Sequence, residues 1–436
     1  MKGVRSFLVL VVIAAALGGF LYYDSKREPG DGKKQDKVFA AVTADKIERV
    51  TVKSTSGDRT TIEKQGAAWQ VSQPSAMPAD EAELSGIASN LASLEVQRVV
   101  DDQATDLKQY GLDPARIEVT FTFAGKEHKL LLGQKTPTGA DLYAKVPDSP
   151  RVFLVASYLE STFNKSSFDL RDKTILKIDR DKVERVEIVT AERTITVTKQ
   201  GADWRISAPI DARADFGAVE GIVGRLNTTP MKSVAAADAT DLKEYGLDSP
   251  AATVRVTSGS AQAGLAIGKS AGEGVVFAKD LARPMVFTIE SALLDDLKKP
   301  ADEFRVKDLF DARAFNTTRI EIVRGGQTIT LEKDKGKDGW TQIAATRKPA
   351  DAAKVDALLS ALTSARAASF VDQISGSGLD APEVTIAIAY EDGQKHEKVA
   401  FARKGADAYA RREGDAGAKI DSSALEGIIK AIDALR

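Results

Sequence analysis

Three copies of one sequence pattern divide this chain. Its only three tryptophans, Trp69, Trp204 and Trp340, lie 135 and 136 residues apart. Each of the first two follows a Lys-Gln-Gly-Ala stretch and begins a segment of alternating polarity. Such a spacing is typical of a tandem array of whole domains, since solenoid repeats span only about 20–50 residues. The length of 436 residues is consistent with three domains of ordinary size.

A second repeated motif begins 35 residues after each of the first two tryptophans and has the core Tyr-Gly-Leu-Asp. Residues 104–113 and 239–248 agree at nine of ten positions. The motif residues are Tyr110, Gly111, Leu112 and Asp113, then Tyr245, Gly246, Leu247 and Asp248, and in the third copy only Gly378, Leu379 and Asp380. We predict a short helix that is capped by Thr105 or Thr240 and ended by the glycine, which tolerates left-handed backbone. Both signatures are interpreted as structural, so no catalytic, cofactor-binding or metal-binding residue is assigned.

The repeat unit is predicted to combine strands with one amphipathic helix. Period-two alternation over residues 49–53, 60–64 and 69–71 predicts a three-stranded antiparallel meander. A helix then begins at an aspartate in each copy, because a carboxylate at that place accepts otherwise unpaired amide hydrogens. These aspartates are Asp80, Asp215 and Asp351, and the apolar stripes that follow are Leu84, Ile87 and Leu91, Val219, Ile222 and Leu226, and Val355, Leu358 and Leu362.

Further strands and a closing helix complete the predicted unit. In the first copy the strands are 117–123, 129–132, 142–146 and 152–155, and the closing helix runs from about 157 to 171. The corresponding closing helices span about 291–307 and 422–435. The predicted fold class is α+β, with three tandem homologous domains that are mostly antiparallel sheet with a packed amphipathic helix. Their expected bounds are 38–175, 176–312 and 313–436.

The N-terminus has the pattern of a membrane anchor. Lys2 and Arg5 precede an uncharged run over residues 6–23, near the lower limit of about 17–25 residues for a spanning helix. We predict a signal anchor at 1–24 with a cytoplasmic N-terminus, followed by a polar linker at 25–37. Two alternatives stay open: cleavage as a signal peptide at Ala14-Ala15-Ala16, and a merely buried helix.

Composition excludes several classes of function. The formal net charge is −2 and no long basic run occurs, so the electrostatic pattern of a nucleic-acid-binding protein is lacking. Aromatic residues make up 6% of the chain, which offers few platforms for stacking bases or sugars. The absence of cysteine removes disulfides, thiolate metal sites and a cysteine nucleophile.

Two glycine-containing segments resemble nucleotide-binding motifs but fail their requirements. Residues 263–270 depart from a phosphate-binding loop at one position, and a strand follows where a helix is required. We interpret this segment as a turn between strands, as we do residues 133–136 in the first copy. Residues 376–381 match a relaxed dinucleotide pattern, yet they too lead into a strand and are interpreted as a turn.

The remaining candidate residues also have ordinary structural explanations. His128 and His396 are the only histidines, and both are predicted to face solvent on polar strands without a nucleophile or further ligands nearby. The aspartates lack the dense alternating pattern of a calcium loop and are interpreted as caps and turn residues. The tryptophans are predicted to anchor the cores, with ligand platforms as the alternative.

With these motifs and the anchor in place, the chain resembles the bacterial family called domain of unknown function 4340, from about residue 40 onward. The resemblance rests on Trp69, Trp204 and the two Tyr-Gly-Leu-Asp motifs; the third copy departs from it, with Ser377 in place of the tyrosine. It implies an envelope protein, often encoded beside an auxiliary ABC transporter of the gliding-motility kind. A complex with the permease or the associated periplasmic subunit follows as an expectation, and no catalytic residue is carried over.

Three functions remain open at this point. The first is a non-enzymatic envelope protein, anchored in the inner (cytoplasmic) membrane by a single span, with its bulk in the periplasm and bound to an ABC-transporter complex or another envelope component. The second is a periplasmic module that binds lipid, glycan or peptide. The third is an enzyme that uses paired carboxylates about 5–10 Å apart, as glycosidases do. The anchor, the triplication and the lack of a catalytic motif favour the first, without cofactor or nucleic acid.

Overall fold

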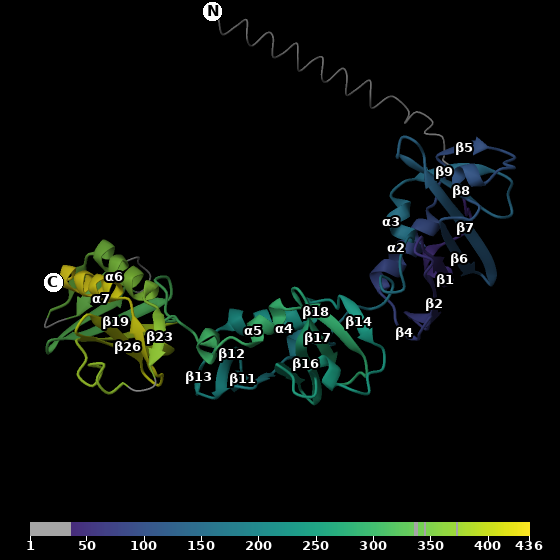
Figure 1. Cartoon of the computed structure of the whole chain (residues 1–436). Helices are drawn as coiled ribbons and strands as arrows, with labels where there is room; N and C mark the ends of the chain where they lie inside the picture. Colours follow the sequence, from purple (N-terminus) through teal and green to yellow (C-terminus); the bar gives the residue numbers. More distant parts are fainter. Residues whose placement is uncertain (1–35, 335–338, 344–345, 372–373) are drawn as a thin grey trace, which may run out of the picture. The chain divides into compact units, whose positions relative to one another are not determined.

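The protein folds into three successive nine-stranded antiparallel sheets (Figure 1). The computed structural model describes residues 36–334, 339–343, 346–371 and 374–436. Two compact units divide the chain, one up to Lys173 and one from Thr174 to Arg436. The first holds one sheet and the second holds two. The tandem antiparallel architecture predicted from the sequence is thereby confirmed.

The predicted anchor at residues 1–24 lies outside the described residues, as does nearly all of the linker at 25–37. Within the part of the chain that is described, no helix has the length and apolar character needed to span a bilayer.

The first sheet has the strand order β4-β3-β2-β1-β6-β7-β8-β9-β5. Its strands are β1 (Ile47–Lys53), β2 (Arg59–Gln65), β3 (Ala68–Gln73), β4 (Met77–Pro78), β5 (Arg98–Asp101), β6 (Ile117–Phe123), β7 (Lys126–Lys135), β8 (Asp141–Lys145) and β9 (Val152–Ala156). The helices are η1 (Ala44–Lys46), α2 (Glu81–Ala92), η2 (Lys108–Tyr110) and α3 (Leu159–Phe163).

The other two sheets repeat this order. The second comprises β10 (Arg185–Thr190), β11 (Thr194–Gln200), β12 (Asp203–Ala208), β13 (Ala212–Arg213), β14 (Ser233–Ala236), β15 (Ala252–Ser258), β16 (Ala261–Gly272), β17 (Val275–Asp280) and β18 (Val286–Glu290), with η3 (Arg180–Lys182), α4 (Phe216–Thr228), η4 (Lys243–Tyr245), α5 (Ala292–Leu297) and η5 (Ala301–Phe304). The third comprises β19 (Thr317–Arg324), β20 (Gln327–Lys333), β21 (Trp340–Ile343), β22 (Lys348–Ala350), β23 (Ala367–Val371), β24 (Val384–Tyr390), β25 (Lys395–Lys404), β26 (Asp407–Arg412) and β27 (Gly417–Ile420), with α6 (Ala352–Ser364) and α7 (Ser422–Ala434).

Alternating side chains give each sheet one buried face. In β1, Val50 and Val52 are fully buried, and Val50 lies between Ile62 of β2 and Phe121 of β6. The apolar stripe of α2 packs into the same core. Because strand residues two apart point to the same side, these contacts fix the register of the central strands. The meander and the helix were therefore predicted correctly.

The predicted helix starts are confirmed. Asp80, Asp215 and Asp351 are the N-cap residues of α2, α4 and α6, and their carboxylates accept amide hydrogens of the first turn. Leu84, Ile87 and Leu91 are each fully buried, as are the stripe residues of α6, and those of α4 are at most 5% exposed.

The closing helices differ from prediction in the first two copies. They are short, ending at Phe163 in α3 and at Leu297 in α5, while α7 begins at the predicted Ser422 and ends at Ala434, one residue before the predicted end. After α3 the carboxylate of Asp169 accepts hydrogens from the amide and hydroxyl of Ser166 and turns the chain. The chain then extends so that Arg171 forms an antiparallel bridge with Ala79. A longer helix would prevent that bridge.

The connection between the second and third sheets is short and is held by two antiparallel bridges. Arg305 bridges Ala214, as Arg171 bridges Ala79, and three residues later Asp308 bridges Arg366 in the third repeat. Only Val306 and Lys307 separate the two bridges.

Candidate functional site

The three tryptophans lie inside the domains. Trp69, Trp204 and Trp340 are 6%, 3% and 5% exposed. The ammonium groups of Lys64 and Lys199 lie 5.5 and 5.6 Å from the first two ring centroids and close the rings off from the outside. Since the rings are buried, they are core residues and offer no platform for a ligand.

The Tyr-Gly-Leu-Asp motif forms the same left-handed turn in the first two repeats. Gly111 has φ 67° and Gly246 has φ 66°, which glycine adopts without steric cost. The predicted threonine caps are wrong, because the N-cap residues of η2 and η4 are Leu107 and Leu242, which make no side-chain capping bond. The carboxylates of Asp106 and Asp241 instead accept the amide hydrogens two residues later, as in an Asx turn.

The rest of the motif packs onto the sheet. Leu112 and Leu247 are 3% and 6% exposed, whereas Asp113 and Asp248 point to the outside. The ring centroids of Tyr110 and Tyr143 lie 5.0 Å apart, and those of Tyr245 and Phe277 lie 5.1 Å apart. Burial raises the pKa of the Tyr110 hydroxyl, and the neighbouring Asp101 raises it further.

Two glycines that sequence reasoning treated as part of a turn allow this packing. Gly133 lies in β7 and Gly268 in β16, at bulges where the register shifts. A Cβ atom would lie 2.0 Å from the Tyr110 carbonyl oxygen at Gly133 and 2.1 Å from the Tyr245 carbonyl oxygen at Gly268. The phosphate-loop-like segment is therefore strand, not a turn between strands, and its glycine serves close backbone approach.

The third repeat builds this region differently. Ser377, which replaces the tyrosine, is buried, and its hydroxyl donates to the carbonyl oxygen of Ile374. Gly378 has φ 83°, and Leu379 is 2% exposed. Asp380 is exposed. All three copies thus use the motif to seat a turn on the sheet.

The two histidines occupy different surroundings. His128 is half-buried in β7, where its ring stacks on Phe121 at 5.2 Å and contacts Phe39 at 5.7 Å. The prediction that it faces solvent is therefore wrong, because the described N-terminal segment brings Phe39 over it. His396 is exposed on β25, as predicted. Among the described residues no cluster of three or more histidines and carboxylates is placed to hold a metal ion.

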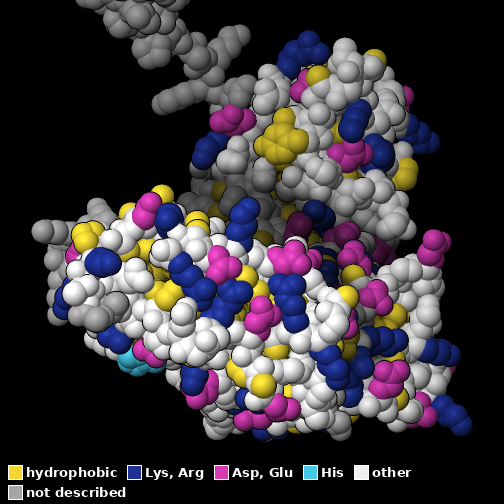
Figure 2. Space-filling view, turned by 90° about the vertical axis from the view of Figure 1, so that its left-hand side faces the viewer, with side chains coloured by type: hydrophobic (Ala, Val, Ile, Leu, Met, Phe, Trp, Pro, Cys, Tyr) yellow, Lys and Arg dark blue, Asp and Glu magenta, His cyan; other side chains and the backbone are white. Residues whose placement is uncertain are grey.

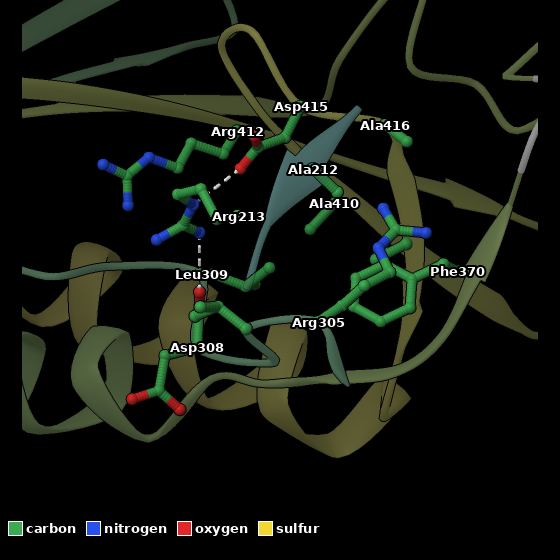
Figure 3. Close-up of a pocket in the computed structure, with 12 residues that line it drawn as sticks. Ala212, Arg213, Arg305, Asp308, Leu309, Phe370, Ala410, Arg412, Asp415 and Ala416 are labelled. Atoms are coloured by element: carbon green, nitrogen blue, oxygen red, sulfur yellow. Dashed lines mark hydrogen bonds and ion pairs between the residues drawn. The ribbon is translucent and has the colours of Figure 1, made fainter. Parts of the chain in front are cut away.

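A charged cluster joins the second and third repeats within the second unit, and its side chains line a small cavity (Figure 3). Arg213 of β13 extends between Asp415 and the segment that connects the second and third repeats (residues 305–312). Its Nε lies 3.0 Å from Asp415 Oδ2, its Nη1 lies 2.8 Å from Asp311 Oδ1, and its Nη2 donates to Asp308 O at 3.1 Å. At the right of Figure 3 the Arg305 guanidinium lies 3.4 Å from the ring centroid of Phe370. We call the residues that make these contacts the junction cluster: Arg213, Arg305, Asp308, Asp311, Phe370 and Asp415.

Buried charges continue the junction cluster into the third repeat. Arg412 Nη1 lies 2.7 Å from Asp311 Oδ2 and 3.1 Å from Glu397 Oε2. The Glu397 side chain is fully buried and accepts the amide hydrogens of Asp311 and Ala312 at 2.9 Å each. Burial alone would lower the pKa of Arg412, but Asp311, Glu397 and Asp415 outweigh it and raise the pKa.

The junction cluster is suited to holding two repeats together. Each of its carboxylates faces an arginine, and the ion pairs of Arg213 cross from the second repeat to the third. The cavity beside it measures about 20 Å³, room for roughly one water molecule. Sequence reasoning missed the junction cluster because Arg213 and Asp415 are 202 residues apart.

Two larger hollows lie on the third sheet. One of about 580 Å³ is lined by residues that include Lys398, Arg411 and Glu413. The other, about 280 Å³, includes Arg319 and His396. Figure 2 shows that basic and acidic side chains alternate over the visible face without a broad patch of one sign.

Family comparison matches this repeated unit twice. The family described as Domain of unknown function (DUF4340) matches residues 69–203 and 204–382. The chain belongs to this family. The resemblance drawn from the tryptophans and the Tyr-Gly-Leu-Asp motifs is thereby confirmed. Each DUF4340 match begins at a tryptophan, in the third strand of a sheet, so the matched frame cuts across the structural repeat.

Other comparisons add no function to this DUF4340 protein. No curated protein matches it. Solved structures with detectable similarity include DNA polymerase III subunit beta from Pseudomonas aeruginosa, at 9% identity and a TM-score of 0.17 over 88% of this chain and 93% of that one. The griselimycin-bound DnaN sliding clamp from the same organism has 8% identity and a TM-score of 0.15 over 88% and 92%. TM-scores this low carry no argument about fold or function.

Proposed function

We propose that this protein is a non-enzymatic envelope protein that binds other proteins. Residues 1–24 anchor it in the bacterial inner membrane by a single span, and the three repeats stand in the periplasm. Its partner is an ABC-type transport or gliding-motility-like system, through the permease or an associated periplasmic subunit. No cofactor and no nucleic acid take part.

The observation that carries this proposal is the place of the repeated residues. The tryptophans are buried in the cores, and the Tyr-Gly-Leu turns pack against the sheets, so both serve the fold. Because the repeated residues are needed for packing, they specify the fold that the three domains share. The outer faces of the domains can then carry different side chains. An array of equal domains with unequal surfaces fits an interaction protein better than an enzyme with one active site.

The outer faces of the first strands show this difference. At one position β1 carries Thr51, whereas β10 carries Glu187 and β19 carries Glu321. Glu187 pairs with Arg255 on the neighbouring strand at 3.2 Å. In the first repeat the corresponding charge lies elsewhere, on Glu118, which pairs with two lysines. Each repeat therefore presents its own charge pattern to a partner.

The test is cross-linking of the full chain in native membranes, followed by capture and identification of what is attached. Specific recovery of a permease or periplasmic transporter subunit supports the proposal. Recovery of the chain alone contradicts it, as would turnover of a substrate that one point substitution abolishes. A charge-reversing change at Arg255 alters one outer face without touching the core, so a drop in recovery with this variant would place a partner contact on that face.

A periplasmic module for lipid, glycan or peptide is the second candidate. The hollow of about 580 Å³ on the third sheet favours it, because ligand sites commonly measure about 300–1,000 Å³. Its charged lining fits a polar glycan or peptide better than a lipid tail. Binding of such a ligand that is lost in Lys398→Glu would support this candidate.

A further inference from the structure

The sheet edge formed by β4 in the first repeat and by β13 in the second is closed by a further segment of the chain. At the end of the first sheet the Asp80 amide donates to Leu170 O at 3.0 Å, and the Asp172 amide donates to Pro78 O at 2.9 Å. In the second sheet the Asp215 amide donates to Phe304 O at 2.7 Å, and the Val306 amide donates to Arg213 O at 3.1 Å. We call residues 170–173 and 304–307 the edge-closing segments.

The same edge is open in the third repeat. Ala350 corresponds to Ala79 and Ala214, since each lies ten residues after its tryptophan. Those two alanines are 5% and 6% exposed, whereas Ala350 is only half-buried. β22 ends its sheet, and no described segment bridges it from outside. Because Ala350 pairs inward with Trp340, the outward-pointing groups are the Pro349 carbonyl and the Asp351 amide.

The edge-closing segments themselves indicate what fits there. They read Leu170-Arg171-Asp172-Lys173 and Phe304-Arg305-Val306-Lys307, so both follow the pattern apolar–Arg–any–Lys. The apolar residue is at most 3% exposed and the arginine at most 9%. In the first repeat the lysine reaches the N-cap carboxylate, with Lys173 Nζ 3.4 Å from Asp80 Oδ2. Asp351, the N-cap residue of the third repeat, is exposed.

A second copy of this chain is a poor candidate for binding at the open edge of β22. Both apolar–Arg–any–Lys segments already close edges within their own repeats. The segment before the first repeat, Lys33-Lys34-Gln35-Asp36, lacks the apolar residue and the final lysine. Pairing of β22 with β22 of another copy would bring Lys348 and its neighbour Arg347 against like charges, which disfavours strand addition.

We propose that the open edge of β22 receives an extended segment of a partner protein, with the sequence apolar–Arg–any–Lys, by addition of a strand to the third sheet. Main-chain hydrogen bonds to the Pro349 carbonyl and the Asp351 amide hold the segment, and the Asp351 carboxylate attracts its lysine. This inference rests on the proposed role as a partner-binding protein and names where one partner docks.

A peptide from the chain itself tests the inference. The probe is a synthetic peptide of residues 300–308 with cysteine in place of Lys307, whose position in the second repeat lies opposite the position that corresponds to Lys348. Because this replacement removes the motif lysine, trapping tests the main-chain pairing alone. The chain has no cysteine, so Lys348→Cys in the full-length protein in detergent gives one trapping position. Lys430→Cys, exposed on α7 of the same repeat and outside the hollows of the third sheet, is the matched control.

We expect the disulfide yield at Lys348→Cys to exceed that at Lys430→Cys at least about tenfold. N-methylation of the peptide at Val306 removes one main-chain donor and should lower the yield by about tenfold, near the upper value of one hydrogen bond. Peptide without cysteine should also slow amide hydrogen exchange in the wild-type segment that contains Asp351. The amides of Asp80 and Asp215 should exchange slowly from the start, because they are already bonded.

Equal yields at the two cysteines, or unchanged exchange at Asp351, overturn the inference. If trapping fails while native cross-linking recovers a transporter subunit, the edge is not the docking site and the proposed function stands. If trapping succeeds while capture recovers the chain alone, the strand-addition site stands and the proposed function falls.

Discussion

Replacement of Gly133 by alanine tests how the signature turn is seated. The added Cβ would lie 2.0 Å from the carbonyl oxygen of Tyr110, where 3.0 Å is already closer than such contacts occur. The obstacle is backbone, so no side chain can rotate away. The whole turn must withdraw from β7, which would also loosen the contact between Tyr110 and Tyr143.

The magnitude follows from the kind of clash. One extra carbon in a well-packed region costs about 1–3 kcal/mol, and a rigid backbone obstacle places this case at about 3 kcal/mol. Gly268→Ala should cost as much in the second repeat, where the corresponding distance is 2.1 Å. The matched control is Gly86→Ala inside α2, where a Cβ meets nothing within 4 Å. It should stabilise the protein by about 0.5–1 kcal/mol through helix propensity.

The assay is urea unfolding followed by the fluorescence of one tryptophan. A background with Trp204→Phe and Trp340→Phe leaves Trp69 as the reporter of the first repeat. Gly133→Ala should lower the transition midpoint without changing the slope, since the surface exposed on unfolding stays the same. If the free energy of unfolding stays within about 0.5 kcal/mol of the parent, the turn is not seated on β7 and the reasoning fails.

Three further predictions concern the core, the charged outer face and the junction cluster. Trp204→Ala should destabilise the second repeat by about 3–5 kcal/mol in denaturant unfolding, and an unchanged midpoint would mean that the ring is not buried. Hydrogen bonds from two lysines lower the pKa of Glu118, so its contribution to stability is full above the ordinary value of 4.5 and is lost as pH falls through the lowered folded-state pKa. Glu118→Gln should therefore destabilise the protein near neutral pH but not in acid, and equal losses at both ends would contradict this. Glu397→Gln should cost about 3 kcal/mol in thermal or urea unfolding, because Arg412 stays buried with one carboxylate fewer, and a neutral result would argue against the ion pair.

The sequence predicted those elements whose signal is local. Alternation identified strands such as β6, whose bounds Ile117–Phe123 match the prediction. The helix starts were readable because a capping aspartate acts on amides two or three residues away. Burial of the tryptophans followed from their place at the start of alternating strands.

Features that depend on distant contacts could not be derived in the same way. Strands of two to four residues, such as β4 and β5, are too short to show alternation and exist because neighbours pair with them. The lengths of α3 and α5 depend on bridges formed elsewhere in the repeat. The closeness of Gly133 to Tyr110 has no local sign, although the recurrence of glycine at 268 was a signal that could have led to it.

The junction cluster lay furthest from sequence reasoning. Arg213 meets Asp311 and Asp415 only because the second repeat's edge, the segment that connects the second and third repeats, and the β26–β27 turn come together. Arginine and aspartate are common surface residues, so neither type nor spacing marks them. The candidate site is thus a product of tertiary structure, whereas the repeated motifs are products of the domain itself.

The tight connection between the second and third repeats has a mechanical consequence. From Arg305 to Asp308 the chain makes three steps of about 3.8 Å each, and both ends of this stretch are hydrogen-bonded into sheets. The two residues between the bridges cannot extend much further when the chain is pulled. A load applied at one repeat would pass directly to the bridges and the salt bridges of Arg213, so these bonds must yield before the repeats can move apart. Under tension the second and third repeats should therefore stay together until these bridges and ion pairs break.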